Sequence, residues 1–76
     1  MFRYRIHLDT GKEVQDFVTI CSKCPGKIIL QGEDEFGVGC TVSARSLIGT
    51  LYAMQWHSVY CVAEHEIYHE IKDFIL

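Results

Sequence analysis

The feature that most constrains the fold is the order in which hydrophobic periodicities follow one another along the chain. Residues 2–8 alternate apolar with mostly basic side chains, and this period of two predicts a strand with one buried face. Residues 11–24 then carry apolar side chains at helical spacing, after a Thr-x-x-Glu sequence, Thr10 to Glu13, that is typical of a helix start. The Pro-Gly pair that follows ends this helix. The chain therefore begins with a strand and an amphipathic helix.

The rest of the chain continues this alternation of strands and helices. The apolar patterns predict, in chain order, strands at 27–31 and 36–42, a helix that begins near Ser46, a strand at 57–63 and a helix at 64–76. The resulting order, β-α-β-β-α-β-α, predicts a single α+β domain that spans the whole chain. Its two layers are a four-stranded sheet with one face open to solvent and three helices on the other face.

The small size and the charge of the chain limit the functions it can have. A chain of 76 residues buries only about 60% of the surface of its unfolded form, so we expect neither a deep catalytic cleft nor a bound cofactor. The net charge of −3 offers no basic field to nucleic acid or anionic lipid. No stretch is long and apolar enough to span a bilayer, and the opening residues do not resemble a secretory signal. We therefore expect a cytoplasmic protein whose four cysteines are reduced.

The segment Val42–Gly49, Val-Ser-Ala-Arg-Ser-Leu-Ile-Gly, resembles the HPr family, the histidine-containing phosphocarriers of the bacterial sugar phosphotransferase system. In that family a strand ends in Val-x-(Ala/Leu)-(Lys/Arg)-Ser-(Ile/Leu)-x-Gly before a short helix. The predicted order of elements also matches, including a Phe-Val pair, Phe17 and Val18, in the first helix. The resemblance implies an antiparallel sheet in the order 1-4-2-3 and, as partners, other proteins of sugar transport or carbon regulation. A ferredoxin-like domain with the sheet order 4-1-3-2 is the alternative fold.

The chain departs from the HPr family where the family carries its phosphoryl group. The family's carrier histidine lies in a Gly-Leu-His-x-Arg-Pro stretch at the start of the first helix, and the corresponding stretch, Thr10 to Val14, has no histidine, arginine or proline. Glu13 instead places a carboxylate near the amides that a phosphate would need. We therefore expect a non-enzymatic regulatory protein without carrier activity. An active carrier that uses a histidine at another position is the alternative.

Ser46 matches a functional residue of the family. In HPr proteins the corresponding serine, at the start of the second helix, is phosphorylated by a dedicated kinase, and the apolar residues beside it contact regulators. The resemblance therefore implies regulatory phosphorylation of Ser46 and a partner surface at Arg45, Leu47 and Ile48. The alternative is that Ser46 is only an N-cap and that Leu47 and Ile48 pack into the core.

The sequence His65-Glu-Ile-Tyr-His69 is a literal His-Glu-x-x-His, the pattern that holds zinc in a class of hydrolases. On a helix over 64–76, both histidines would face solvent, opposite the apolar stripe, and no third ligand follows them. We therefore expect no metal centre. A small metal-binding module on His65 and His69 is a further alternative.

Cys21 and Cys24 form a C-x-x-C motif at the end of the first predicted helix. The helix dipole there has the wrong sign to lower a thiol pKa, so the motif predicts core thiols and not a redox site. Cys40 and Cys61 occupy apolar positions of predicted strands and also indicate core residues. A zinc site that joins the C-x-x-C pair to the two histidines is permitted by the topology but not by the predicted directions of the side chains.

The basic side chains of the first predicted strand, Arg3, Arg5 and His7, are expected on the open face of the sheet together with Tyr60. A solvated sheet face is the simpler interpretation, and a partner site is the alternative. The pattern predicts no role for Trp56.

Overall fold

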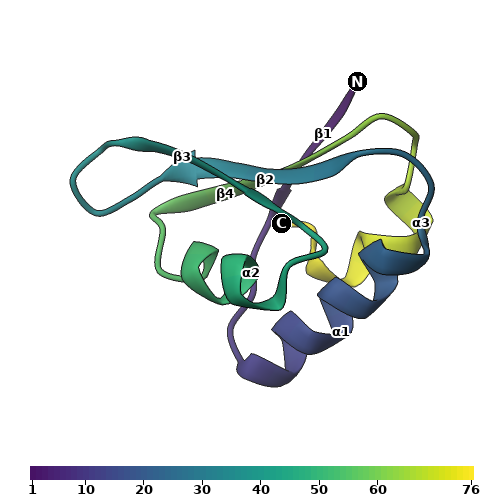
Figure 1. Ribbon diagram of the computed structural model, residues 1–76, viewed down its shortest axis with the longest axis horizontal. Helices are drawn as coiled ribbons and strands as arrows, with labels where there is room; N and C mark the ends of the chain where they lie inside the picture. Colours follow the sequence, from purple (N-terminus) through teal and green to yellow (C-terminus); the bar gives the residue numbers. More distant parts are fainter.

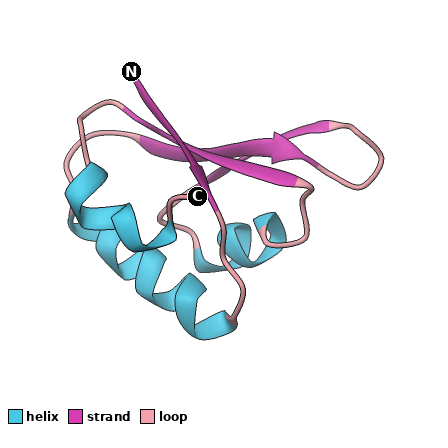
Figure 2. Cartoon of the chain, turned by 180° about the vertical axis from the view of Figure 1, so that it is seen from behind, coloured by secondary structure: helices cyan, strands magenta, loops and turns pink.

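A computed structural model describes residues 1–76 and contains one four-stranded sheet with all helices on the same side of it (Figure 1). The strands are β1 (Phe2–Ile6), β2 (Ile28–Glu33), β3 (Gly39–Ser43) and β4 (Ser58–Ala63). The helices are α1 (Gly11–Lys23), α2 (Leu47–Ala53) and α3 (Tyr68–Ile71), and a 3-10 turn at Lys72–Phe74 continues α3. The view from behind shows the opposite sheet face free of helices (Figure 2). The predicted α+β two-layer architecture is confirmed.

The sheet order is β1-β4-β2-β3, and all neighbouring strands are antiparallel. This confirms the order 1-4-2-3 and excludes the ferredoxin-like alternative. One row across the sheet runs from Tyr4 through Cys61 and Leu30 to Val42, and it faces the helices. The period of two seen in each strand therefore separates a helix-covered face from an open one.

The core lies between the inner sheet face and the helices. Its largest fully buried apolar side chains come from α1 (Val14, Phe17, Cys21), β2 (Ile28, Leu30), β4 (Cys61) and the C-terminal segment (Ile67, Ile71). Phe17 also meets Phe74 edge-on, with 5.4 Å between ring centroids. None of the helices is long and apolar enough to cross a membrane.

Helix α1 begins as its sequence predicts. The Thr10 hydroxyl accepts a hydrogen bond from the Glu13 amide at 3.1 Å, and the Glu13 carboxylate accepts one from the Asp9 amide at 2.9 Å. Two amides at the helix start are thereby satisfied by side chains of the same segment.

Trp56 packs on the inner face of the sheet against Gly32. A Cβ atom at Gly32 would lie 2.7 Å from Cε3 of Trp56 and closer still to the Ser58 carbonyl oxygen. Trp56 is 6% exposed. The indole therefore takes the space that a side chain on β2 would otherwise fill, and this is the role that the sequence pattern did not indicate.

The prediction of a helix over 64–76 is wrong at both ends, because α3 begins only at Tyr68 and the 3-10 turn that continues it ends at Phe74. Hydrogen bonds to distant parts of the fold hold the segment before α3: the Glu64 carboxylate accepts one from the Lys27 amide at 2.5 Å, and the Glu64 amide donates one to the Lys27 carbonyl oxygen at 3.1 Å. The Tyr4 hydroxyl accepts one from the Ile67 amide at 3.2 Å. Ile67 and Ile71 are nevertheless buried as expected. Tertiary hydrogen bonds thus replace a turn of helix that the local pattern favours.

The prediction of a strand over 36–42 is also wrong at its start, because β3 begins at Gly39. The Asp34 carboxylate accepts hydrogen bonds from the amides of Phe36 and Val38, both at 2.9 Å, and so forms a turn. Phe36 is consequently 82% exposed at the tip of the β2–β3 hairpin.

Candidate functional site

Helix α2 presents four large apolar side chains to solvent. Leu47, Ile48, Leu51 and Tyr52, which together we call the α2 patch, are 42%, 82%, 41% and 49% exposed. The small residues on the other side of the helix, Thr50 and Ala53, are completely buried. The alternative that Leu47 and Ile48 pack into the core is therefore wrong.

Leu51 and Tyr52 were not predicted as part of this surface. A signal for them exists in the sequence, because residues 47, 48, 51 and 52 share one side of a helix. On the other side the chain offers only small residues, which allow the helix to lie close to the sheet. In α2 the small side chains face the core, so the large apolar side chains on the opposite side of the helix are exposed to solvent.

Ser46 is the N-cap of α2. Its hydroxyl accepts a hydrogen bond from the Gly49 amide at 3.0 Å, and the residue is half-buried. The first turn of α2 contains no acidic side chain. The N-cap role is therefore confirmed, and the hydroxyl lies directly beside the α2 patch.

Arg45 connects the start of α2 to the end of α1. Its guanidinium donates hydrogen bonds to the carbonyl oxygens of Cys21 at 3.1 Å, Cys24 at 2.6 Å and Gly26 at 2.6 Å. A cation at a helix C-terminus is favourable, because unpaired carbonyl groups and the helix dipole both place negative charge there. Arg45, predicted as a partner-binding residue, thus also holds two parts of the fold together.

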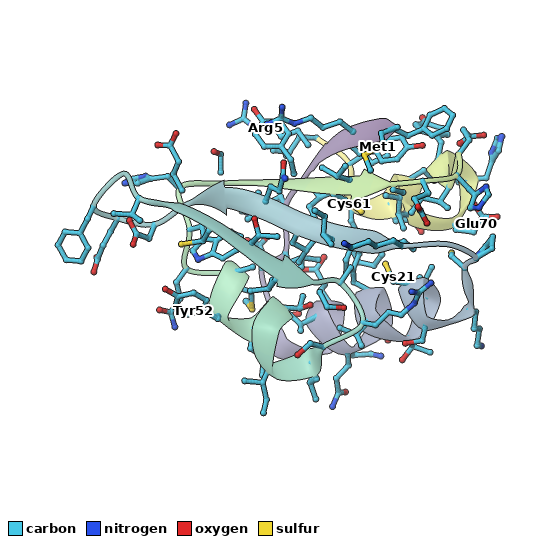
Figure 3. All side chains as sticks on the ribbon, turned by 45° about the horizontal axis from the view of Figure 1, so that its top comes forward. Met1, Arg5, Cys21, Tyr52, Cys61 and Glu70 are labelled. Atoms are coloured by element: carbon cyan, nitrogen blue, oxygen red, sulfur yellow. The ribbon has the colours of Figure 1, made fainter.

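The α2 patch continues onto neighbouring elements at both ends. Leu47 adjoins a group of α1 residues (Gln15, Asp16, Val18, Thr19). Tyr52 lies at the end of the helix away from α1 (Figure 3). There it borders Phe36 and the acidic side chains Asp34 and Glu35, and its ring meets that of Trp56 edge-on at 5.7 Å. The exposed apolar surface therefore reaches the hairpin tip and has an acidic rim.

The start of α1 has a different electrostatic character. His7 is the histidine nearest to it in the chain, and its Nε2 lies 2.5 Å from a carboxylate oxygen of Asp9. Glu13 occupies the amide of Asp9, as described above. His7 also lines a small cavity with Arg5 and His57. Carboxylates thus lie at the helix start, whereas the arginine and the second histidine line the same cavity as His7.

His65 and His69 do not form the arrangement of a zinc hydrolase. His65 lies in the non-helical segment before α3, with its ring over Gly26: a Cβ atom there would be 2.5 Å from Cδ2 of the ring. His69 lies within α3, and its ring meets that of Tyr68 edge-on at 5.6 Å. The two histidines are therefore not separated by one turn of helix. No group of three or more potential metal ligands occurs in the chain.

The four cysteines are free thiols. Cys21 and Cys61 are completely buried, and a hydrogen bond between them, together with burial, raises the pKa of Cys21 far above its ordinary value. Burial raises the pKa of Cys24 as well, and its thiol donates to the Ile20 carbonyl oxygen at 3.3 Å. Cys40 is partly buried against the core. The prediction of core thiols is confirmed for the buried Cys21, Cys24 and Cys61, whereas Cys40 only borders the core. The raised pKa values of Cys21 and Cys24 oppose thiolate chemistry.

The open face of the sheet carries Arg3, Arg5 and Tyr60 as predicted, whereas His7 lies beyond the end of β1 at Ile6. The Arg3 guanidinium lies over the Tyr60 ring, 4.1 Å from its centroid, in a cation–π contact. Gln31, Thr41 and Ser58 surround Tyr60 on the same face. This surface is polar, in contrast to the α2 patch.

Comparison with known proteins does not assign the chain to a family. No family model, no curated protein and no solved structure matches it significantly. The candidate site is accordingly defined by the chain's own geometry: an exposed apolar patch on α2 with a capping serine at one end and an aromatic, acid-rimmed hairpin tip at the other.

Proposed function

We propose that the chain is an HPr-like regulatory protein that binds another protein of sugar transport or carbon regulation through the α2 patch and does not act as a phosphoryl carrier from phosphoenolpyruvate. The observation that carries this proposal is the exposure of Leu47, Ile48, Leu51 and Tyr52. Large apolar and aromatic side chains gathered on one side of a rigid element are typical of the centre of a protein interface. The acidic rim at Asp34 and Glu35 favours a partner with basic residues around an apolar groove.

The position of Ser46 supports a regulatory role. Its hydroxyl is one residue from Leu47, so a phosphate there would add close to two negative charges at the edge of the α2 patch. A partner that buries Leu47 and Ile48 would have to accept or desolvate this charge. Phosphorylation of Ser46 is therefore proposed as the switch that changes the affinity of the patch for its partner.

The start of α1 argues against carrier activity. A phosphoryl group needs free amides and a cation, whereas Thr10 and Glu13 occupy backbone amides here and Asp9 adds a further carboxylate. Like charges around the site would repel a phosphoryl group. We therefore expect no transfer of phosphate from phosphoenolpyruvate to this part of the chain.

Two phosphorylation assays test the proposal. Incubation with ATP and HPr kinase is expected to give acid-stable phosphoserine, and Ser46→Ala is expected to abolish the label. Ser43→Ala, which changes a neighbouring serine that caps no helix, is the matched control and should keep it. Incubation with phosphoenolpyruvate and the first enzyme of the system should leave every histidine unlabelled. Labelling of Ser46→Ala, or acid-labile phosphohistidine, would contradict the respective part of the proposal.

The patch itself is tested with partner proteins of the same system. Ile48→Asp places a charge at the most exposed position of the α2 patch and is expected to weaken binding at least tenfold. Tyr68→Asp changes an exposed apolar residue on α3, outside the α2 patch, and serves as the control; Tyr68 is 47% exposed, against 82% for Ile48. Equal effects of both substitutions would show that general surface charge, not the α2 patch, determines binding.

One observation favours an active carrier as the second candidate function. A cation, Arg5, and two imidazoles, His7 and His57, line one cavity, and a phosphorylated imidazole there would share that cavity with a positive charge. Under this alternative the phosphoenolpyruvate assay gives an acid-labile label that His7→Ala removes and His65→Ala does not.

A further inference from the structure

The two edges of the sheet differ in how they are protected. At the β1 edge, the Leu76 amide donates to the Arg5 carbonyl oxygen at 2.9 Å and the His7 amide donates to the Phe74 carbonyl oxygen at 2.9 Å. Ile75 forms a β-bridge with Ile6 at the same place. The C-terminal segment thus covers part of β1. No segment pairs with the outer side of β3, which forms the opposite edge (Figure 1).

The hydrogen bonds of β3 show which of its backbone groups are free. The Asp34 amide donates to Val38 and the Ala44 amide donates to Ile28, so the even-numbered residues of β3 pair with β2. In an antiparallel ladder the residues between them point their N–H and C=O groups away from that partner. Gly39, Thr41 and Ser43 therefore direct these groups outward, and all of them are exposed.

This edge lacks the features that prevent one sheet from pairing with another. Natural edge strands carry charged residues, prolines or bulges. The nine residues from Phe36 to Ala44 contain no charge and no proline, and the outward residues of β3 have small side chains or none. The first charged residues on either side, Glu35 and Arg45, have opposite signs.

From these observations we infer that β3 pairs with β3 of a second copy of the chain, antiparallel and across a two-fold axis at Thr41, to form a continuous eight-stranded sheet. The Thr41 residues of the two copies then form a hydrogen-bonded pair, and Gly39 of each copy pairs with Ser43 of the other. Facing threonines are a favourable cross-strand pair on the open sheet face. The inference does not rest on the proposed function.

The same register explains two further exposed residues. With Thr41 at the axis, the hairpin tip of one copy, with Val38 and Phe36, follows the paired residues on the side where the turn before α2 leaves β3 of the other copy. The exposed apolar hairpin tip of each copy thereby approaches the start of α2, with Leu47, in its neighbour. At both ends of the seam, the acidic Glu35 side of one copy adjoins the Arg45 side of the other. A second copy would therefore pair with the free backbone groups of β3, cover the apolar hairpin tip and bring side chains of opposite charge together.

Sedimentation equilibrium over a range of concentrations up to millimolar protein tests this inference. The unmodified chain and Thr41→Val, which keeps shape and strand propensity, are expected to dimerise with similar constants. Thr41→Lys leaves the inner face untouched but places two ammonium groups opposite each other, so its dimer dissociation constant should rise about tenfold or more. Circular dichroism checks that the variants are folded. A monomer at all concentrations, or a Thr41→Lys dimer as stable as the original, overturns the inference.

Cross-linking tests the register separately. Hydrogen-bonded antiparallel partners have Cα atoms about 5.5 Å apart, within the range that a disulfide bridges. Thr41→Cys treated with glutathione disulfide should therefore give a covalent dimer. Gln15→Cys on the exposed face of α1 and the unmodified chain are the controls and should not. If the chain dimerises but Thr41→Cys does not cross-link, the two-fold axis does not lie at this residue. If β3 pairs only with an extended segment of another protein, the chain is a monomer in both experiments, and the inference is overturned.

Discussion

Replacing Arg45 by methionine removes the guanidinium but keeps most of the side-chain length. The loss affects three hydrogen bonds at once, because the guanidinium donates to the carbonyl oxygens of Cys21, Cys24 and Gly26. These carbonyl groups belong to the end of α1 and the turn that leads into β2. We therefore expect Arg45→Met to loosen the connection between α1, β2 and the start of α2.

The size of the effect follows from the geometry. A hydrogen bond from a charged donor contributes about 1.5–3 kcal/mol when buried, but these three share one partly exposed guanidinium and do not add fully. The favourable position of a cation at a helix C-terminus adds about 0.3–1 kcal/mol. We expect the free energy of unfolding to fall by about 2–3 kcal/mol, whereas ordinary surface substitutions change it by less than about 0.5 kcal/mol. For a domain of this size that corresponds to a melting temperature lower by roughly 10–20 °C.

Urea denaturation followed by fluorescence measures this effect, since the chain has a single tryptophan, the buried Trp56. Arg45→Lys keeps a charge but lacks the planar fork, so it should lie between the original chain and Arg45→Met. Arg5→Met, on the open sheet face, is the matched control and should be nearly neutral. The reasoning is refuted if Arg45→Met and Arg5→Met have the same stability.

Three further predictions concern the core. Gly32→Ala should destabilise the chain by at least about 2 kcal/mol in urea denaturation, because the added methyl group would collide with Trp56 and with the backbone of β4; an unchanged midpoint would show that the sheet yields without cost. Thr50→Val should stabilise it by about 1 kcal/mol, since the buried Thr50 hydroxyl has no hydrogen-bond partner; a loss of stability would reveal a partner. The raised pKa of Cys21 means that the unfolded chain releases this proton first. The contribution of Cys21 to stability is therefore full below its ordinary pKa of 9.0 and is lost as the pH rises above it. Cys21→Ala should accordingly show a shallower decline of unfolding free energy above pH 9, by about 1.4 kcal/mol per pH unit, and identical slopes would contradict this assignment.

Much of the fold could be predicted because its local signals agree with its tertiary contacts. The alternation in residues 2–8 and the helical spacing after Thr10 identify β1 and α1, and the hydrogen bond of Thr10 shows why α1 begins where it does. The order of elements and the HPr resemblance together predicted the sheet order. Hydrophobic periodicity predicts these elements because one face of each is buried, and burial of one face places apolar residues at a regular spacing in the sequence.

The candidate site could be predicted only in part. The sequence identified the Ser46 cap and the residues beside it, but it left open whether Leu47 and Ile48 face the core, because a short helix with apolar residues on two sides can turn either one inward. The small size of Thr50 and Ala53 decides this, since only their side of α2 fits closely against β2 and β3. Leu51 and Tyr52 join the exposed surface for the same reason.

The sequence by itself determined the α+β class, the two layers and the positions of most strands and helices, because these depend on hydrophobic spacing within short segments. Only the tertiary structure decided which strand ends and helix turns form. The hydrogen bonds of Glu64 to Lys27 and of the Ile67 amide to Tyr4 hold the segment before α3 and prevent a longer helix, and the Asp34 turn places Phe36 in solvent. The start of α3 depends on hydrogen bonds between residues distant in the chain, and the start of β3 depends on a turn that competes with the strand. Hydrophobic periodicity contains information on neither of these interactions.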